Sequence, residues 1–461
     1  MTRLLVVGAD AAGMSAAHQA LRTAARTGRH LEVVALEQTG HTSYSACGIP
    51  YWVAGDVDEP DDLVARTPAR HRDLGIDLHT GMTARALDLD RRVVTATAAG
   101  SGAEVEFGFD ELVLATGSEP IVPAWARGSD GALIRGVLPV KTLTDGSAWL
   151  DALFGGAPAP LRGVVIGGGY IGLEMAEALL RRGLEVTLVT LDEVMATLDP
   201  DMGGRVRDTL TAAGIKILTD TAVTGLSTRA DGAVSAVHAD GVELEADVVV
   251  LAMGVTPATA LGAAGGLPLG GRRGYLPDNR QQIVDGVWAA GDCCEILHRI
   301  TGRRVHLPLG THANKEGRVA GTNIGGGHAT FDGALGTAIT RFSGSGVHVE
   351  IARTGLSSAE AAAAGLDVMT MVTEGRTASS YMPEASPMAT KVLAERTSRR
   401  LLGLQIVGGP GSGKRIDTAA VALWGGASID DLAGMDLAYA PPFATVWEAV
   451  QLAARRLADR L

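Results

Sequence analysis

The chain of 461 residues contains only three cysteines, too few for a framework of disulfides. This usage fits a reducing compartment, and we expect a cytoplasmic protein. The apolar run near the amino terminus, Leu4–Val7, is far shorter than a signal peptide or a membrane span. The net charge of −12 argues against a nucleic acid or an anionic membrane as the main partner. A small-molecule substrate is expected instead.

Glycine, in contrast, is abundant, with 61 residues, which suits a chain that brings its backbone close to phosphates several times. Two segments repeat one pattern of apolar strand, Gly-rich turn, Ala-rich helix and second apolar strand. The first comprises Leu4–Val7, Gly8–Gly13, Met14–Arg26 and Leu31–Leu36; the second comprises Gly163–Ile166, Gly167–Gly172, Leu173–Arg182 and Val186–Val189. Both predict βαβ units that feed parallel sheets.

The region after Gly325–Gly327 follows a different pattern. We expect strands at Thr337–Phe342, Val347–Ala352 and Val368–Val372, and helices at Asp417–Trp424 and Thr445–Arg455. The predicted fold class is therefore α/β, with two Rossmann-like dinucleotide-binding domains and a C-terminal α+β domain.

The first glycine turn predicts a dinucleotide site. Gly8 suits the tight turn, Gly13 suits close packing of helix on strand, and Ala12 lies between them. Glu37, 24 residues after Gly13, ends the second strand, where a carboxylate can accept hydrogen bonds from ribose hydroxyls. Asp10 departs from the pattern, because the middle position is usually glycine and a carboxylate there must point away from the pyrophosphate.

The second glycine turn is more complete. The residues expected to bind the nicotinamide cofactor are Gly167, Gly169, Tyr170, Ile171, Gly172, Glu174 and Thr190. Thr190 occupies the position where an acid would select NAD, whereas Asp192 and Glu193 would repel the 2′-phosphate of NADP. The sequence therefore favours NADH over NADPH as the cofactor.

Two further turns, Leu112–Gly117 and Val287–Asp292, complete a set of four motifs whose order resembles the pyridine nucleotide-disulfide oxidoreductase family. The resemblance implies that Thr116 and Gly117 lie at the crossover between nucleotide domains and that Asp292 holds the ribityl chain of FAD. It also implies FAD contacts at Ala84 and Pro308, and a turn around Gly254 that closes the nicotinamide domain. The implied domains are an FAD-binding domain (1–150 and 276–330), an NAD(P)H-binding domain (151–275) and a dimerisation domain (331–461).

A possible reactive sulfur, Cys47, lies in the run Ser43–Tyr51. A thiol here can attack an external disulfide and be released by reduced flavin. Two-cysteine family members carry a second Cys where this chain has Trp52, so the segment resembles the single-cysteine branch: coenzyme A disulfide reductases and related NADH oxidases and persulfide reductases. Many of these oxidases place a His where this chain has Ala11. Ser43 is a further catalytic candidate, and Cys293 and Cys294 are expected to be packed beside the flavin.

The C-terminal run Ala438–Trp447 also resembles coenzyme A disulfide reductases. In the resembling enzymes, two tyrosines of the partner subunit reach the sulfur, and the matching positions are Tyr439 and Tyr381. A tyrosine hydroxyl can donate a proton to a leaving thiolate. We therefore expect a homodimer with a shared active site.

The resulting hypothesis is electron flow from NAD(P)H through FAD and Cys47 to a small disulfide, with coenzyme A disulfide suggested by the resemblance. The candidates to meet the substrate phosphates are Arg22, Arg26, Arg66, Arg70 and Arg72, although these arginines would equally suit a solvated face. The alternatives are an NADH oxidase in which Cys47 cycles through sulfenic acid, a persulfide reductase, and a flavin-bearing redox sensor. No metal site is expected.

Overall fold

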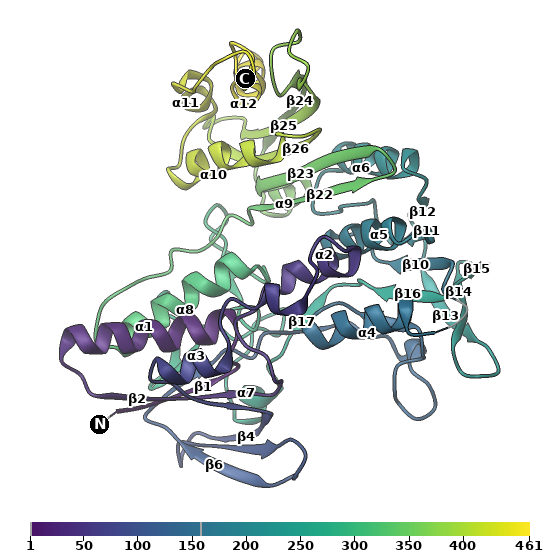
Figure 1. Cartoon of the computed structure of the whole chain (residues 1–461). Helices are drawn as coiled ribbons and strands as arrows, with labels where there is room; N and C mark the ends of the chain where they lie inside the picture. The colour runs from purple at the N-terminus through teal and green to yellow at the C-terminus, as the bar shows by residue number, and fades with distance from the viewer. Residues whose placement is uncertain (1, 157–158) are drawn as a thin grey trace. The chain divides into compact units, whose positions relative to one another are not determined.

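The computed structural model (Figure 1) describes residues 2–156 and 159–461, and its contacts divide the chain into two compact units. Unit 1 comprises Met1–Ile49, Val57–Pro120 and Val255–Ala334; unit 2 comprises Pro50–Asp56, Ile121–Gly254 and Leu335–Leu461. Each unit is described by itself.

Unit 1 is built on a six-stranded sheet whose neighbouring strands are parallel except at the antiparallel edge pair β18–β19. Its order is β18 (Gln282–Val284), β19 (Val287–Ala289), β7 (Glu111–Leu114), β1 (Thr2–Val7), β2 (Leu31–Glu37) and β3 (Asp77–Thr80). A smaller antiparallel sheet contains β4 (Met82–Asp88), β5 (Val93–Ala98) and β6 (Glu104–Gly108). The two sheets share one hydrophobic core, in which Leu5, Leu112 and Phe107 are buried.

The helices of unit 1 are α1 (Ala11–Thr27), α3 (Pro68–Asp73), α7 (Ala260–Ala264) and α8 (Gly310–Ile324). The long helices α1 and α8 lie side by side (Figure 1). Glycines of α8 permit this close approach: a Cβ at Gly317 would lie 2.2 Å from the Ala12 carbonyl oxygen, and one at Gly321 would lie 2.2 Å from that of Ala16. The packing fixes the first turn of α1, where the expected phosphate loop ends.

Unit 2 contains a second, fully parallel sheet. Its order is β12 (Lys216–Leu218), β11 (Glu185–Val189), β10 (Arg162–Ile166), β16 (Val248–Leu251) and β9 (Val137–Pro139). A three-stranded antiparallel sheet accompanies it, formed by β13 (Val223–Thr228), β14 (Val234–Ala239) and β15 (Val242–Glu245). The helices of this part are α2 (Ile49–Ala54), α4 (Leu143–Phe154), α5 (Tyr170–Arg181) and α6 (Pro200–Ala212).

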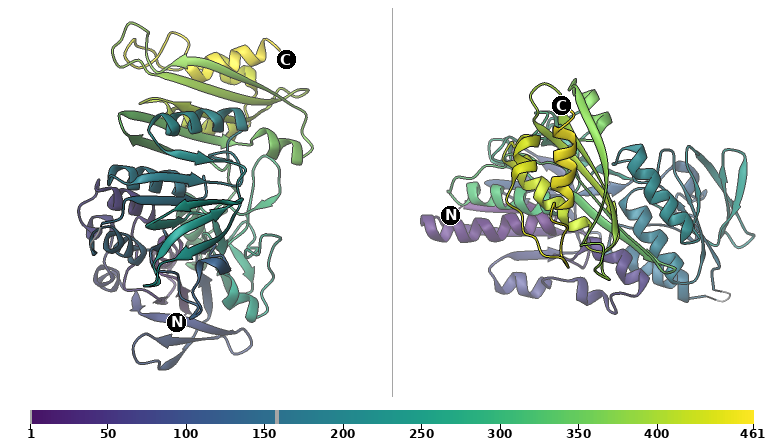
Figure 2. Two further views of the ribbon diagram at one scale, coloured as in Figure 1. Left: turned by 90° about the vertical axis from the view of Figure 1, so that its right-hand side faces the viewer. Right: turned by 90° about the horizontal axis from the view of Figure 1, so that it is seen from above.

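The C-terminal part of unit 2 is a five-stranded antiparallel sheet. Its order is β22 (Ala338–Gly344), β23 (Val347–Gly355), β26 (Leu401–Gly408), β25 (Pro387–Glu395) and β24 (Val368–Arg376). Helices α10 (Ile416–Trp424) and α12 (Ala449–Ala458) pack against this sheet (Figure 2), and α9 (Ser358–Ala363) and α11 (Ile429–Gly434) are shorter.

The expected fold class is confirmed: two parallel-sheet nucleotide folds and a separate C-terminal α+β sheet are present. The chain crosses from unit 1 to unit 2 after Pro120 and returns to unit 1 at Val255. β9 pairs with β16, which places Val137–Pro139 in the second parallel sheet. Helix α12 begins at Ala449, four residues later than Thr445, because the Glu448 side chain caps it by accepting from the Val450 amide. No helix in the described ranges combines the length and apolarity needed to cross a bilayer.

Candidate active site

The two glycine turns adopt the same backbone geometry. A Cβ at Gly8 would lie 2.1 Å from the carbonyl oxygen of Ala115, and one at Gly13 would lie 1.9 Å from that of Gly8. In the second unit, a Cβ at Gly167 would lie 2.1 Å from the carbonyl oxygen of Ala252, and one at Gly172 would lie 1.9 Å from that of Gly167. Only glycine fits at these positions, because the clashing atoms belong to the backbone. Each turn opens a helix, α1 or α5, whose first N–H groups are suited to bind a pyrophosphate.

Asp10 and Glu37 bind to separate backbone groups around the first turn. Asp10 does not cap α1; its Oδ1 accepts a hydrogen bond of 3.3 Å from the Tyr44 amide, in the loop that carries Cys47. One oxygen of the Asp10 carboxylate thereby binds the loop that carries Cys47. Glu37 is buried at the end of β2 and accepts from the Ala9 amide at 3.0 Å and from the amide and hydroxyl of Thr39, both at 2.8 Å. A carboxylate with four lone-pair sites retains capacity for a ribose hydroxyl.

The structure brings the expected crossover residues together within unit 1. The Thr116 hydroxyl donates to the Ala258 carbonyl at 2.5 Å, and the Ala258 amide donates to the Gly117 carbonyl at 3.0 Å. Ser118, next in the chain, donates to Asp292 Oδ2 at 2.9 Å. Gly117 has φ +72°, and a Cβ there would meet no protein atom within 4 Å, so the backbone borders open space in which a cofactor can lie.

The buried carboxyl of Glu316 holds the turn that carries Asp292, and the sequence analysis did not predict it. Glu316 of α8 is 1% exposed and accepts a 2.8 Å hydrogen bond from the Gly291 amide. Burial raises the pKa of Glu316 to about 8. No sequence pattern marks this residue, since it lies in a helix without a nucleotide motif.

The remaining FAD candidates are also placed in unit 1. Ala12 packs in a small buried cluster with Ala290 and Ala313. Ala84 lies in β4 against the main core, and Pro308 precedes the first residue of α8 by two positions.

The second nucleotide turn carries most of the expected nicotinamide residues. Tyr170 and Ile171 open α5, and Glu174 accepts from the Thr340 hydroxyl at 2.8 Å; burial raises the pKa of Glu174 to about 7. A Cβ at Gly169 would meet no protein atom within 4 Å, which leaves its backbone accessible to a ligand. Gly254, with φ +95°, accepts from the Ile121 amide at 3.0 Å.

The residues expected to decide between NADH and NADPH lie after β11. The buried Thr190 lies against the glycine turn, since a Cβ at Gly168 would be 3.1 Å from the Thr190 hydroxyl oxygen. Glu193 forms a 2.5 Å ion pair with Arg207, a residue that the sequence did not point to. Asp192 is exposed. The repulsion of a 2′-phosphate by Glu193 is therefore offset in part by Arg207.

Cys47 lies in an anchored loop. It is exposed in the short helical turn Ala46–Gly48, whereas Cys293 and Cys294 are buried. The Ser45 amide donates to Leu63 and the Ala65 amide donates to Ser43, both at 2.8 Å, which ties the loop to a neighbouring strand-like segment. Burial raises the pKa of Cys294 well above its ordinary value, which suits an unreactive thiol.

The expected phosphate-binding arginines are all exposed: Arg22, Arg26, Arg66, Arg70 and Arg72. Arg22 donates to the Gln19 side-chain oxygen and Arg72 donates to the Leu78 carbonyl, both at 3.0 Å. Arg22 and Arg66 also lie close enough to His18 to lower its pKa.

Tyr381 and Tyr439 lie on two loops that the structure joins. The Ser379 amide donates to the Pro441 carbonyl at 2.9 Å, and Arg415 donates to carbonyl oxygens in both loops: Thr377 at 2.5 Å and Phe443 at 2.6 Å. No sequence pattern predicts this bridging role of Arg415. This part of the chain exposes many large apolar side chains: Tyr381, Val421, Trp424, Tyr439, Phe443, Val446 and Trp447.

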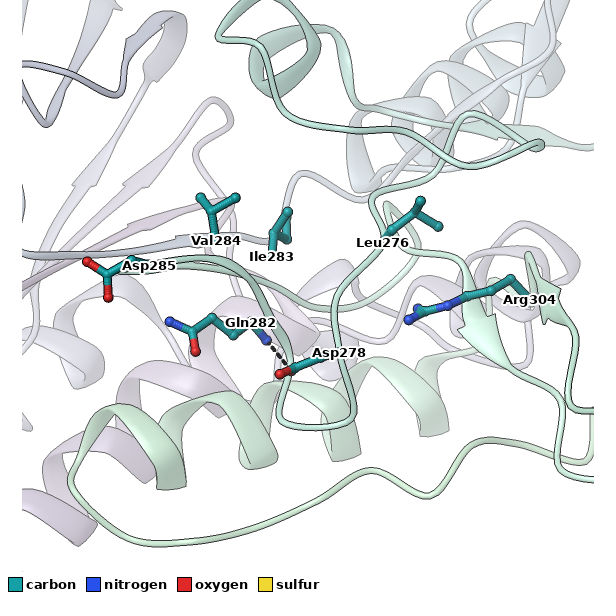
Figure 3. A pocket seen from close by; sticks show the side chains of 7 residues that line it. All are labelled: Leu276, Asp278, Gln282, Ile283, Val284, Asp285 and Arg304. Atoms are coloured by element: carbon teal, nitrogen blue, oxygen red, sulfur yellow. Dashed lines mark hydrogen bonds between the residues drawn. The ribbon is translucent and has the colours of Figure 1, made fainter.

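A hollow of about 400 Å³ borders the edge strand β18 (Figure 3). Asp278 accepts from the Gln282 amide at 2.9 Å, and Arg304 lies across the hollow (Figure 3). Its lining includes no cysteine, histidine or glycine-turn residue, so it is separate from the candidate active site. Across the described part of the chain, no three His, Cys, Asp or Glu side chains gather as ligands for a metal ion.

Comparisons with known proteins agree with this geometry. A family model described as pyridine nucleotide-disulphide oxidoreductase matches residues 2–317, and its dimerisation-domain model matches residues 346–450. The chain is 36% identical to an NAD(P)H coenzyme A polysulfide/persulfide reductase of Pyrococcus horikoshii, covering 99% of this chain and 98% of the relative. It is 32% identical to an NADH oxidase of Methanocaldococcus jannaschii, covering 100% and 99%. A solved NAD-dependent persulfide reductase from A. fulgidus superimposes with a TM-score of 0.91 at 32% identity, covering 99% of this chain and 83% of that one.

Proposed function

Because the chain belongs to the pyridine nucleotide-disulphide oxidoreductase family, a family of FAD-dependent enzymes that use NAD(P)H, we propose that it reduces coenzyme A disulfide through Cys47. The observation that carries the proposal is the exposed thiol of Cys47 on a loop bonded to the first nucleotide fold, through Asp10 and Tyr44. The overall reaction balances as NAD(P)H + H⁺ + CoA–S–S–CoA → NAD(P)⁺ + 2 CoA–SH. FAD, when bound, carries two electrons from the nicotinamide to sulfur.

The residues of this chain provide the thiol exchange. The Cys47 thiolate attacks one sulfur of the substrate, forms a mixed disulfide and releases the first thiol as a thiolate. Two electrons then reduce the mixed disulfide, which releases the second thiol and restores the Cys47 thiolate. Arg22 and Arg66 are exposed on the same unit and suit the substrate phosphates.

We propose that the enzyme acts as a homodimer with a shared active site. Large apolar side chains are exposed around Tyr381 and Tyr439, in the region that matches the dimerisation-domain model. Exposed apolar surface of this kind supports a subunit interface here. Tyr439 of the partner subunit would donate a proton toward the second thiolate that leaves, with Tyr381 of the partner subunit beside it.

Persulfide reduction is the second candidate function. It is favoured by the names of the relatives from Pyrococcus horikoshii and A. fulgidus. In that reaction the same Cys47 thiolate would attack the sulfur that a coenzyme A persulfide carries. The two candidates differ in substrate and share the thiol.

An anaerobic assay of Cys47→Ser tests the proposal. The protein is supplied with NADH or NADPH and with coenzyme A disulfide, coenzyme A persulfide or glutathione disulfide. FAD content and flavin reduction by the nicotinamide should persist, because Ser is nearly isosteric and the glycine turns are intact. Reduction of coenzyme A disulfide should fall by several orders of magnitude, as is usual for loss of a covalent nucleophile.

Cys293→Ala is the matched control, because it removes a buried thiol of the same chain. It should retain disulfide reduction. Near wild-type turnover by Cys47→Ser would refute the role of this thiol. A wild-type enzyme that reduces only the persulfide would favour the second candidate.

A further inference from the structure

Two histidines connect the Cys47 loop to helix α1. His18 Nε2 on α1 is 2.8 Å from His71 Nδ1 on α3, and His71 Nε2 is 3.0 Å from the Ser43 hydroxyl oxygen. His71 is 0% exposed, whereas His18 and Ser43 are half-buried. The three side chains form a continuous hydrogen-bonded line with a half-exposed group at each end and a buried ring between them.

Each member of this line can both donate and accept a proton. A neutral imidazole carries one N–H and one lone pair, and a hydroxyl carries both functions. The line has two directions that use the same atoms: either His18 donates to His71, which donates to Ser43, or every bond is reversed. Changing from one direction to the other moves one proton along the line.

The surroundings keep both rings neutral, as this exchange requires. Burial, followed by repulsion from His71, Arg66 and Arg22, lowers the pKa of His18 to about 4. Burial and then Arg66 lower the pKa of His71. The charged groups that face the pair are thus arginines, which disfavour a positive ring.

We propose that His18, His71 and Ser43 conduct a proton between solvent and the thiol exchange at Cys47, within one protomer. This inference rests on the proposed function. As the first thiolate leaves the substrate, it takes the proton of the Ser43 hydroxyl. Ser43 takes the Nε2 proton of His71, His71 Nδ1 takes the Nε2 proton of His18, and His18 Nδ1 takes a proton from water. No electrons move in this step, and each proton that is passed on is replaced from the next group outward, the last one from water.

A packing role for His71 does not account for the position of Ser43. Ser43 has φ +50°, a conformation that non-glycine residues adopt rarely, and its hydroxyl is directed to the buried ring. A buried aromatic ring such as Phe would fill the same space without requiring two polar partners. The geometry therefore points to a use for the proton-carrying atoms.

The test compares His71→Phe, Ser43→Ala and the double variant in the complete FAD-loaded enzyme. Two substrates differ in leaving group: coenzyme A disulfide, and 5,5′-dithiobis(2-nitrobenzoate), whose aromatic thiolate leaves without protonation. With coenzyme A disulfide, kcat of His71→Phe should fall about a hundredfold or more with KM nearly unchanged, in the range of general acid catalysis. With the aromatic disulfide, kcat should change by less than about threefold.

Three further readouts separate proton transfer from a structural role. The kcat of His71→Phe should decline more steeply at alkaline pH and should rise with the concentration of imidazole buffer, because a soluble acid replaces the line. The double variant should lose no more than His71→Phe alone, because both changes interrupt one line. His41→Phe, at an exposed histidine of the same segment, should leave all of these values unchanged.

Equal losses with both disulfides, or no response to buffer, would overturn the inference. If His71→Phe does not fold, His18→Gln at the half-exposed end tests the same line, and unchanged kcat and pH profile there would overturn it. Measurements on the wild-type enzyme distinguish failure of the proposed function from failure of the proton line. Failure of wild type to reduce any disulfide refutes the proposed function, whereas active wild type with unaffected variants refutes only the proton line.

Discussion

Glu316 offers a measurable link between pH and the stability of unit 1. Its carboxyl is 1% exposed, and burial raises its pKa from 4.5 to about 8. The folded chain therefore keeps a proton at neutral pH that the unfolded chain releases. Because the folded state binds more protons between pH 4.5 and 8, stability must fall as the pH rises through this window.

The size of the effect follows from the two pKa values. Each pH unit within the window corresponds to about 1.4 kcal/mol, and the total between pH 5 and pH 7 is roughly 2.5 kcal/mol for a single group. Glu316→Gln removes this titration and keeps an oxygen that can accept from the Gly291 amide. Any constant cost of the buried amide cancels when only the change with pH is compared.

The assay is urea unfolding of the FAD-saturated wild type and of Glu316→Gln at pH 5, 6 and 7, monitored by flavin fluorescence. The stability of the variant relative to wild type should increase by roughly 2.5 kcal/mol from pH 5 to pH 7. Glu384→Gln, at an exposed position, controls for the change in net charge. Parallel pH profiles of wild type and Glu316→Gln would refute the assignment of a protonated carboxyl.

Three substitutions test the nicotinamide site. Gly172→Ala should prevent the second nucleotide fold from forming, because its Cβ would lie 1.9 Å from the Gly167 carbonyl oxygen; a soluble variant with normal NADH affinity would contradict this. Gly169→Ala should fold normally, because its Cβ meets no protein atom within 4 Å, but should raise the KM for NADH about tenfold by crowding the phosphates; an unchanged KM would exclude this contact. Glu193→Gln should increase the kcat/KM ratio of NADPH to NADH about tenfold, because it frees Arg207 to meet the 2′-phosphate; no increase would show that the phosphate lies elsewhere.

Local sequence patterns predicted the nucleotide folds well. The expected strand Leu4–Val7 and helix Met14–Arg26 lie within β1 and α1, and Gly163–Ile166 lies within β10. The matching family models confirm the resemblance inferred from the four turns. These elements were predictable because glycine spacing and apolar strands are local consequences of binding a dinucleotide.

The C-terminal sheet was predicted only in part. The expected strands match β22, β23 and β24, but the central strand β26 and its neighbour β25, both almost wholly buried, were not expected. Burial on both faces removes the alternation that reveals a strand. β25 also contains Lys391, whose ammonium pairs with Asp199 and Asp201 at 2.7 Å, a distant partnership that no local pattern discloses.

Side chains that meet across long separations explain the rest of what the sequence could not show. Ser118 and Asp292 are 174 positions apart, and His18 and His71 are 53 apart. Neither pair forms a motif, because each residue alone is an ordinary polar side chain. Only the fold, which places α1 beside α3 and β7 beside β19, makes them neighbours.

Comparing the two nucleotide folds of the chain identifies the positions that can give each one a different cofactor preference. The glycine turns of the two units agree in both close approaches, 2.1 Å and 1.9 Å, so the turns themselves do not distinguish their cofactors. The units differ at the middle of the turn, Asp10 against Gly169, and at the end of the second strand, Glu37 against Thr190. In the first unit Asp10 Oδ1 accepts a hydrogen bond from the Tyr44 amide, which couples the phosphate loop to the loop of Cys47. The second unit has Gly169 there, where a Cβ would meet no protein atom within 4 Å, which suits the nicotinamide cofactor expected at this turn.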